Sequence, residues 1–457
     1  MKYVSTRGAS PAISFEEVLI SGPAPDGGLY VPETWPTVDL TRMRGKPGAA
    51  YADLAASVVA LFASPEWYRS IERHAHEAYA KWDDRRIAPL VPYGEHRWLL
   101  ELFHGPTLAF KDFALQLLAP LMNEALARRK QRALVLAATS GDTGAAAVAA
   151  LAGQPNIDLV VLHPKGRISD VQRRQMTTAT APNVRNIAIE GTFDDTQALV
   201  KQVFADQAFA KEHGLAAINS INWVRIAAQA AYYISSCLAL DRKAVTFSVP
   251  TGNFGDVFAG YVAKQLGAPI RRLIVATNVN DILARAIATG TYAKGDVHAT
   301  MSPAMDIQVA SNFERLLYES HGRDAAEVKR QMGAFAATGR LTIAPAALAK
   351  IQALFVADRV DEAETAATIR LMHRDAKLVV DPHTAVGLTA TRKVTPDEDV
   401  VVLATAHPAK FPEAVEKAAG VKPELPARLR GILTAPERYD TLPNDVAALK
   451  HHLAAKR

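Results

Sequence analysis

A lysine near the start of an expected helix is the residue of this chain best suited to covalent chemistry. Lys111 follows the strand-like run Trp98–Leu102 and lies in the first turn of an apolar helical pattern that extends from about Phe110 to Leu126. The first turn of a helix has unpaired N–H groups and the positive end of the helix dipole, so a cation gains nothing there. The rings of Phe110 and Phe113 would also exclude water, which lowers the pKa of the amine. A neutral amine can form a Schiff base with an aldehyde, although a solvated lysine that begins a helix would show the same local pattern.

Two turns with glycines, each between an expected strand and an expected helix, are suited to anions. In the turn Pro250–Asp256, Gly252 and Gly255 would let backbone N–H groups converge on a phosphate at the start of the next helix. The G-x-x-G spacing is neither the dinucleotide-binding fingerprint nor the loop of nucleotide hydrolases, and it also occurs in plain structural turns. The turn Thr139–Gly144 has the same form, and its hydroxyl and N–H groups would suit a carboxylate. An ordinary helix cap is the alternative there.

A third loop, Asn219–Arg225, follows a short strand and opens a helix. Arg225, together with Ser220 and Asn222, could clamp a phosphate because a guanidinium matches two phosphate oxygens in a fork. Taken alone, the pattern is also that of a solvated arginine on a helix. Lys165, in another loop after a strand, is a weaker candidate for the same purpose.

The elements that must position these loops alternate between short β-branched runs and amphipathic helices from Trp98 onward. The expected strands are Ala133–Ala138, Asp158–Leu162, Val184–Ile189, Ala216–Ile218, Ala244–Val249, Leu273–Thr277, Lys377–Val380 and Val400–Ala404. This alternation is typical of βαβ units and of a parallel sheet that is covered on both faces. Ligands of such sheets collect at the carboxyl ends of the strands, where the glycine turns lie.

The remaining stretches are expected to be mainly helical. Residues 1–93 form a mostly helical entry region, in which Ser14–Glu17 has the pattern of a capping box. Residues 281 to about 376 break the alternation and are interpreted as a helical insertion, with a second capping box at Ser311–Glu314. The tail beyond about Pro426 is expected to be helical and polar.

Composition places the chain among ordinary globular enzymes and argues against several other classes. The 457 residues are 22% charged and 49% hydrophobic, with a net charge of +5. No basic patch with interleaved aromatic residues indicates nucleic-acid binding. No run of about twenty apolar residues is free of charge, and the N-terminus lacks the apolar core of a signal peptide. Cys237 is the single cysteine, which excludes an intrachain disulfide and a cysteine-based metal site. We therefore expect a cytoplasmic enzyme that binds no metal, membrane or nucleic acid.

Four segments, in this order, resemble the motifs of threonine synthases, which use pyridoxal 5′-phosphate. They are His104–Phe113, Ser140–Gly144, Thr251–Asp256 and Thr405–Phe411, and Ser5–Gly8 and Asp26–Pro32 extend the resemblance over nearly the whole chain. The similarity is to the long-chain class of bacteria and yeast. It implies the tryptophan-synthase-β-like (fold type II) pyridoxal-phosphate fold, an α/β architecture with two parallel-sheet domains. On this basis we expect an N-terminal region at 1–93, a large cofactor domain at 94–135 and 216–457 that contains the helical insertion, and a small domain at 136–215.

The resemblance also implies a role for each candidate site residue. Lys111 would hold the cofactor as an imine, and Thr405 would meet its pyridine nitrogen. The cofactor phosphate would be bound by the glycine loop, that is by Gly252, Asn253, Phe254, Gly255 and Asp256. The substrate would be bound at its α-carboxylate end by Ser140, Asp142, Thr143 and Gly144, and at its phosphate by Asn219, Ser220, Asn222 and Arg225. Many related enzymes have asparagine where this chain has Asp142, and His383 and His407 are expected to serve packing.

The activity implied by the resemblance is that of threonine synthase, which converts O-phosphohomoserine and water to threonine and phosphate, in a monomer or homodimer. Two alternatives stay open: a related pyridoxal-phosphate-dependent ammonia-lyase or phospho-lyase, and a non-catalytic cofactor-binding protein. The segment Asn219–Arg225 counts against a dehydratase of serine or threonine, because such an enzyme has no substrate phosphate to bind. Lys111 and the glycine loop are both intact, which counts against a decayed site.

Overall fold

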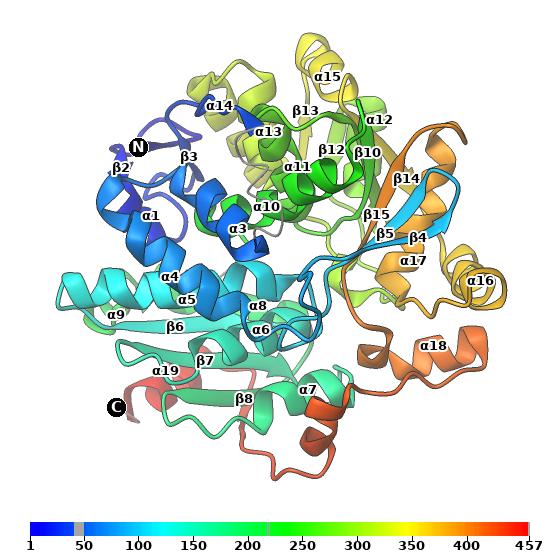
Figure 1. The fold of residues 1–457 in the computed structure, drawn as a ribbon. Coiled ribbons are helices and arrows are strands. Elements are labelled where there is room, and N and C mark those ends of the chain that lie inside the picture. Colours follow the sequence, from blue (N-terminus) through cyan, green and yellow to red (C-terminus); the bar gives the residue numbers. More distant parts are fainter. Residues whose placement is uncertain (41–49, 217, 219, 456–457) are drawn as a thin grey trace.

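The computed structural model describes residues 1–40, 50–216, 218 and 220–455, and its larger sheet has six strands (Figure 1). Their order across the sheet is β14 (Phe355–Arg359), β11 (Ile270–Thr277), β10 (Val245–Pro250), β15 (Val400–Ala404), β5 (Arg97–Glu101) and β4 (Leu90–Gly94). Neighbouring strands are parallel except β4, which runs antiparallel to β5 at one edge. The carboxyl ends of five strands therefore meet at one edge of the sheet.

Alternating side chains along β15 show why this sheet is covered on both faces. Val400 and Val402 pack in a cluster with residues of three helices, α16 (Glu362–Leu371), α17 (Pro382–Thr389) and α18 (Pro412–Ala419). Val401 and Leu403 point to the opposite face and join the main core with α5 (Lys111–Arg128), α10 (Trp223–Leu240) and α11 (Gly255–Gln265). Because successive residues of a strand face opposite sides, a continuous apolar strand needs helices on both.

The smaller sheet has five parallel strands and lies below the larger one in Figure 1. Its order is β16 (Asp440–Pro443), β8 (Val184–Glu190), β7 (Ile157–Pro164), β6 (Ala133–Ala138) and β9 (Leu215–Ala216). Helix α6 (Asp142–Leu151) and Met176 of α7 (Asp170–Thr177) belong to the main core on one face. The other face packs in a separate cluster with α8 (Phe193–Ala205), α9 (Gln207–Glu212) and α19 (Val446–Ala455).

The N-terminal region is less helical than the sequence pattern predicts. It contains a three-stranded antiparallel sheet in the order β2 (Ile13–Ser14), β1 (Lys2–Ser5) and β3 (Tyr30–Pro32). Helix α1 (Phe15–Ile20) lies between β2 and β3 in the chain, and α3 (Tyr51–Ala60) and α4 (Tyr68–Tyr79) follow β3. The capping box at Ser14 and Glu17 is confirmed, since each side chain bonds the other residue's backbone N–H. No helix in the described ranges is both long and apolar enough to cross a membrane.

The expected helical insertion is interrupted by strands. It contains α12 (Ile282–Thr289), β12 (Thr291–Ala293), α13 (Phe313–Ser320), α14 (Ala325–Thr338), β13 (Arg340–Thr342) and α15 (Pro345–Gln352). Strand β14 then returns the chain to the edge of the larger sheet beside β11, so this part of the chain is not a separate helical unit. The capping box expected at Ser311–Glu314 is wrong. Asn312, and not Ser311, precedes α13, and it provides no side-chain cap because its Oδ1 accepts from the guanidinium of Arg315.

Two further predictions about the C-terminal third are wrong. Residues 377–380 form no strand; a short π-helix, Met372–Ala376, ends at Lys377 in the left-handed region, and Asp381 already caps α17. The tail from residue 440 does not belong to the large domain, because β16 pairs with β8 and α19 packs on the smaller sheet. Strand β6 likewise begins at residue 133, before the boundary expected at 135–136. The rest of the proposed domain division remains a proposal.

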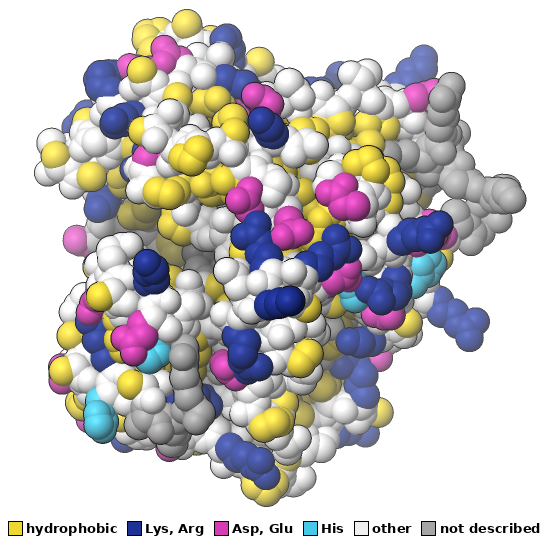
Figure 2. All heavy atoms as spheres, turned by 90° about the vertical axis from the view of Figure 1, so that its left-hand side faces the viewer, with side chains coloured by type: hydrophobic (Ala, Val, Ile, Leu, Met, Phe, Trp, Pro, Cys, Tyr) yellow, Lys and Arg dark blue, Asp and Glu magenta, His cyan; other side chains and the backbone are white. Residues whose placement is uncertain are grey.

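Charged side chains are interspersed on the face shown in Figure 2, where basic groups lie beside acidic ones. Between α4 and α5, for example, Arg73 and Arg128 both contact Glu124, at 2.9 and 2.7 Å. Interspersed charges of both signs create little net field over the surface.

One buried arginine ties the N-terminal region to the loops after the strands. Arg315 of α13 is fully buried and donates hydrogen bonds to the carbonyl oxygens of Tyr30 (2.8 Å) and Ile221 (2.6 Å) and to the side chain of Asn312. Asn312 in turn donates from Nδ2 to the carbonyl oxygens of Ser220 (3.0 Å) and Asn253 (3.1 Å). Burial lowers the pKa of Arg315 to about 9. The two loops that hold Ser220 and Asn253 are therefore positioned by α13.

Replacing Arg315 with methionine is expected to lower the melting temperature by several degrees. The substitution keeps the volume but leaves carbonyl groups buried without donors, which costs about 1–3 kcal/mol each. Circular dichroism during heating checks this. Arg330→Met, at a side chain that is 68% exposed, is the matched control and should change the melting temperature little. An unchanged melting temperature in Arg315→Met would show that these hydrogen bonds do not hold the loops.

Candidate active site

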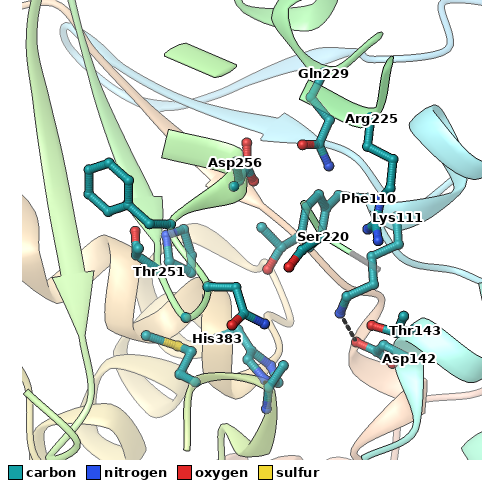
Figure 3. A pocket seen from close by; sticks show the side chains of 18 residues that line it. Phe110, Lys111, Asp142, Thr143, Ser220, Arg225, Gln229, Thr251, Asp256 and His383 are labelled. Atoms are coloured by element: carbon teal, nitrogen blue, oxygen red, sulfur yellow. Dashed lines mark hydrogen bonds and ion pairs between the residues drawn. The ribbon is translucent and has the colours of Figure 1, made fainter. Parts of the chain in front are cut away.

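A pocket at the carboxyl ends of β10 and β15 contains Lys111 (Figure 3). Of the candidate residues from the sequence, it brings together Lys111, Asp142, Thr143, Ser220, Arg225, Thr405 and the glycine loop Gly252–Asp256. Within the described part of the chain, its lining does not include Ser140, Gly144 or Asn222. Asn219 lies outside the described residues. Segments that are far apart in the sequence therefore converge on one amine.

Lys111 is the first residue of α5, as the sequence predicts, and it is only 9% exposed. Its Nζ lies 3.5 Å from Asp142 Oδ2 and 5.2 Å from the centre of the Phe110 ring. Burial lowers the pKa of Lys111; Asp142 opposes this effect, while Lys410 and Arg225 add to it. Schiff-base chemistry requires a neutral amine, and burial shifts the pKa of Lys111 in that direction.

Asp142 is held between two lysines at the start of α6. Its Oδ1 lies 2.9 Å from Lys410 Nζ and accepts a hydrogen bond from Gln172 Nε2 (2.9 Å). Burial raises the pKa of Asp142, but the lysines outweigh burial and hold the pKa well below its usual range. Asp142 is therefore a carboxylate, and its oxygens are acceptors only.

Thr139, Gly141 and Gly144 of the same turn do not line the pocket. Thr139 Oγ1 accepts hydrogen bonds from the N–H groups of Gly141 (2.9 Å) and Gly144 (2.8 Å). Gly141 has φ +132°, and a Cβ there would lie 2.4 Å from the side chain of Gln172. The turn consequently needs a glycine at 141, and the N–H of Gly144 is already used by a protein acceptor.

The glycine loop after β10 has backbone donors that no protein group uses. Within the described residues, the N–H groups of Gly252, Asn253 and Phe254 donate to no protein acceptor. Phe254 has φ +63°, in the left-handed region, and directly precedes α11. A Cβ on Gly252 would lie 2.5 Å from the carbonyl oxygen of Ala304, so a larger residue would not fit. Unused N–H groups beside the start of a helix form a cradle for an anion.

Asp256 lines the same pocket and also connects two helices. Its Oδ1 accepts hydrogen bonds from the hydroxyl groups of Tyr232 (2.5 Å) and Tyr233 (2.9 Å) of α10, while its Oδ2 has no protein partner. Burial raises the pKa of Asp256 to about 6. A carboxylate repels a phosphate, so the side chain is better suited to fastening α11 to α10.

Replacing Asp256 with asparagine is expected to stabilise the cofactor-free protein, and more so at higher pH. The pKa in the folded state, about 6, is above that of an exposed carboxyl group. Protonated Asp256 therefore stabilises the fold at low pH, and this contribution, about 3 kcal/mol, is lost as pH rises from about 4 through 6. The melting temperature of Asp256→Asn should exceed that of the wild type at pH 8 by more than at pH 5. Asp170→Asn, at a side chain that is 78% exposed, should show no such trend, and an equal trend in both variants would contradict the assignment.

Arg225 is a buried cation without a full set of partners. It is 3% exposed in the first turn of α10, and no described residue provides a hydrogen-bond acceptor for its Nε or Nη1. Burial lowers its pKa to about 10. Because a buried charge is costly unless it is paired, the orientation of the guanidinium into the pocket points to an anionic ligand (Figure 3).

Asn222 is not brought to this pocket. Its Oδ1 caps α10 by accepting from the N–H of Val224 (2.9 Å), and its Nδ2 donates to the carbonyl oxygens of Val18 (3.1 Å) and Leu19 (3.2 Å). The side chain therefore joins α10 to α1, since all of its polar atoms are occupied. Asparagine before a helix is a strong N-cap signal, which the sequence interpretation passed over.

The two histidines differ in position. His383 lines the pocket; its Nε2 accepts from the N–H of Ala304 (3.2 Å), so its Nδ1 carries the hydrogen that is shared with Asp381 (2.7 Å). His407 lies outside the pocket lining, where burial and neighbouring His104 lower its pKa to about 4. The structure therefore places His383, but not His407, in the lining of this pocket.

The sequence did not predict several residues of the site, among them Ala304 in the pocket lining. Gln229 lines the pocket one helical turn after Arg225, and the spacing of four residues was the available signal. Met305 lines it from a short helical turn at Pro303–Met305, for which the sequence carries no signal. Lys410, in the segment Thr405–Phe411, contacts Asp142, but its complete burial could not be read from residue types.

The pocket fits pyridoxal 5′-phosphate on the chemistry of its donors. Lys111 supplies a buried amine for the aldehyde, and the free N–H groups of the glycine loop supply a cradle for the phosphate. Thr405, directly after β15, lines the pocket with its carbonyl fixed by the N–H of Phe110 (2.9 Å). No group of three or more potential metal-binding side chains occurs among the described residues.

Comparisons with known proteins match threonine synthases over nearly the whole chain. Three family models match: "Threonine synthase N terminus" at residues 2–79, "Pyridoxal-phosphate dependent enzyme" at 88–359 and "Threonine synthase, C-terminal" at 384–453. Threonine synthase of Pseudomonas aeruginosa is 47% identical over 98% of this chain and 97% of its own length. That of Saccharomyces cerevisiae is 41% identical, covering 91% and 88%.

Solved structures extend the agreement to three dimensions. The crystal structure of threonine synthase from Brucella melitensis with bound pyridoxal phosphate superposes with a TM-score of 0.96 at 47% identity, covering 100% of this chain and 99% of that one. The yeast threonine synthase structure has a TM-score of 0.93 at 37% identity, covering 100% and 98%. The chain therefore belongs to the threonine synthase family of pyridoxal-phosphate-dependent enzymes, and it has their fold type II architecture.

Proposed function

We propose that this protein converts O-phospho-L-homoserine and water to L-threonine and phosphate. The observation that supports this most is the unpaired, buried guanidinium of Arg225 in the pocket of Lys111. The glycine loop can hold the phosphate of the cofactor, so Arg225 is available for a second phosphate, which only a phosphorylated substrate brings. Ser220 lines the pocket beside it and is proposed as a further phosphate ligand.

The site residues divide the proposed reaction between them. When bound, pyridoxal phosphate withdraws electrons from the Cα–H bond of the attached amino acid and makes that proton acidic. Lys111 would hold the cofactor through its Nζ, and the same atom would take the Cα proton and later return it to that carbon. Arg225 holds the substrate phosphate until it departs. Thr143 at the start of α6 binds the substrate carboxylate.

Asp142, Thr405 and the walls of the pocket orient these groups. Asp142 lies 3.5 Å from Lys111 Nζ and directs the amine when it carries the proton. Thr405 lines the pocket and would offer its hydroxyl group to the pyridine nitrogen, which a hydroxyl need not keep protonated. Phe110 and Met305 line the pocket and exclude water from the reacting carbon until it is needed. We also propose a cytoplasmic enzyme that is a monomer or a homodimer.

The deciding experiment measures phosphate and threonine in the same reaction of the purified, cofactor-loaded protein with O-phosphohomoserine. Equal amounts of both products are expected. Phosphate accompanied by 2-oxobutyrate would instead identify a phospho-lyase that eliminates without adding water. Absence of turnover, with intact visible absorbance of the bound cofactor, would refute the substrate assignment and leave the cofactor assignment in place.

A further inference from the structure

Lys410 is a buried lysine that contacts the carboxylate of Asp142 but does not itself line the pocket. It ends the short turn Pro408–Lys410, just after Thr405 at the end of β15. Its side chain is 0% exposed, and its Nζ lies 2.9 Å from Asp142 Oδ1. Lysine is almost never fully buried unless it is paired. Lys410 therefore places a second amine in the interior, at the other carboxylate oxygen of Asp142 from the one near Lys111.

Three acceptors around Lys410 Nζ indicate its protonation state. Besides Asp142, the carbonyl oxygen of Thr107 lies at 2.7 Å and Gln175 Oε1 at 3.0 Å. Gln175 Nε2 donates to the same Thr107 oxygen (3.0 Å), which fixes the amide with its oxygen toward Lys410. An ammonium group has three N–H donors and no acceptor, whereas a neutral amine has two donors. The three contacts thus match the ammonium form.

A single carboxylate is consequently shared between two lysines. Asp142 Oδ1 accepts from Lys410 and from Gln172, while Oδ2 lies 3.5 Å from Lys111 (Figure 3). One negative charge neutralises only one of two buried cations. The shorter and fully coordinated contact belongs to Lys410, whereas the Nζ of Lys111 has Asp142 as its only close polar neighbour among the described residues.

We propose that Lys410 is a positioning residue that occupies Asp142 and thereby leaves Lys111 as the neutral amine that the reaction needs. The inference rests on the proposed role of Lys111 in carrying the cofactor and moving the Cα proton. Lys410 also bonds the carbonyl of Thr107 in the segment that leads into α5, which fixes the place at which Lys111 enters the pocket. The other charged or titratable groups that line the pocket around Lys111 are Arg225, Asp256 and His383.

The test measures the protonation of Lys111 directly, in the full chain without cofactor. Competitive labelling with acetic anhydride over a range of pH, followed by mass spectrometry of the peptide that contains Lys111, gives the pH at which this amine becomes reactive. In Lys410→Met, Asp142 has only Lys111 as a cation partner. The midpoint of reactivity should therefore rise by at least about one pH unit, since nearby charges shift pKa values by about 1–3 units. In Lys410→Arg, which keeps the charge, it should stay close to the wild type.

A double variant, Lys410→Met with Asp142→Asn, provides the matched control. Without the carboxylate, Lys111 has no counter-ion, so the midpoint should return toward that of the wild type. Circular dichroism establishes that each variant is folded. If Lys410→Met does not fold, Lys410→Gln keeps a hydrogen-bond donor without the charge and should show the same rise. An unchanged midpoint in the folded uncharged variant would overturn the proposal and assign Lys410 a purely structural role.

A second readout uses the cofactor-loaded protein. The visible absorbance of the lysine imine titrates with pH, and its midpoint should rise in Lys410→Met for the same reason. Neither measurement involves substrate, so the two proposals fail separately. A shifted midpoint without threonine formation from O-phosphohomoserine would refute only the proposed reaction. Normal threonine formation by the wild type with no shift in the variant would refute only the role of Lys410.

Discussion

Replacing Lys111 with alanine is expected to lower kcat for threonine formation by at least about 10³-fold. The residue is proposed both to carry the cofactor and to move the Cα proton, and general acid–base catalysis alone contributes about 10²–10⁴-fold. The fold should tolerate the change, because Asp142 keeps its contacts with Lys410 and Gln172. Steady-state kinetics together with the visible spectrum check this, since the absorbance of the lysine imine should disappear.

The matched control is Lys165→Ala. Lys165 also lies in a loop after a strand, but its side chain is 54% exposed and pairs with Glu190 at 3.2 Å. Exposed ion pairs contribute little, so this variant should keep the kcat of the wild type. Partial recovery of Lys111→Ala by added small primary amines would support proton transfer by the missing amine. Retention of more than a tenth of the activity by Lys111→Ala would remove the residue from the proposed mechanism.

Replacing Arg225 with methionine is expected to lower kcat/KM by about 10²–10³-fold and, at the same time, to raise the melting temperature. Truncating one partner of a buried charge pair with a ligand costs about 2–5 kcal/mol. In the absence of ligand, however, the guanidinium is buried with two nitrogen atoms unpartnered, which destabilises the fold. Opposite signs for activity and stability would identify a residue that is retained for binding.

Inorganic phosphate provides the binding measurement. It should raise the melting temperature of the cofactor-loaded wild type, because a ligand that binds only the folded state stabilises it. The increase should be lost in Arg225→Met and reduced in Arg225→Lys, which keeps the charge but not the fork of donors. Arg374→Met, at a side chain that is 67% exposed, is the control. Equal stabilisation of all four proteins would place the substrate phosphate elsewhere.

Local patterns predicted the parts of this molecule that depend on neighbouring residues. Strands β6 and β15 have the predicted bounds, Ala133–Ala138 and Val400–Ala404. Lys111 lies at the start of its helix as expected. In each case a run of apolar residues and the adjacent turn determine where the strand or helix begins and ends. The resemblance to a family supplied the common pocket, which no local pattern contains.

Features that depend on distant partners could not be predicted. Strand β16 has the sequence Asp-Thr-Leu-Pro and forms only because the edge of β8 offers hydrogen bonds. The run Lys377–Val380 has strand-like composition, yet it connects a π-helix to the cap of α17 and meets no sheet edge. Burial of Lys410 has no sequence signature either, because lysine is normally exposed. Asn222 was predicted to bind the substrate phosphate, but its Oδ1 instead accepts a hydrogen bond from the N–H of Val224 and caps α10.

The placement of β16 and α19 also affects the order in which the molecule can fold. Strands β6 to β8 and helix α8 emerge from the ribosome early, but β16 and the Leu449 and Leu453 side chains of α19 emerge last. Until then the edge of β8 has unpaired N–H and C=O groups, which can pair with other chains. Domains usually fold in the order of their synthesis, whereas here the smaller sheet is completed only after the larger one. The edge of β8 in a nascent chain therefore stays unpaired until β16 has been synthesised.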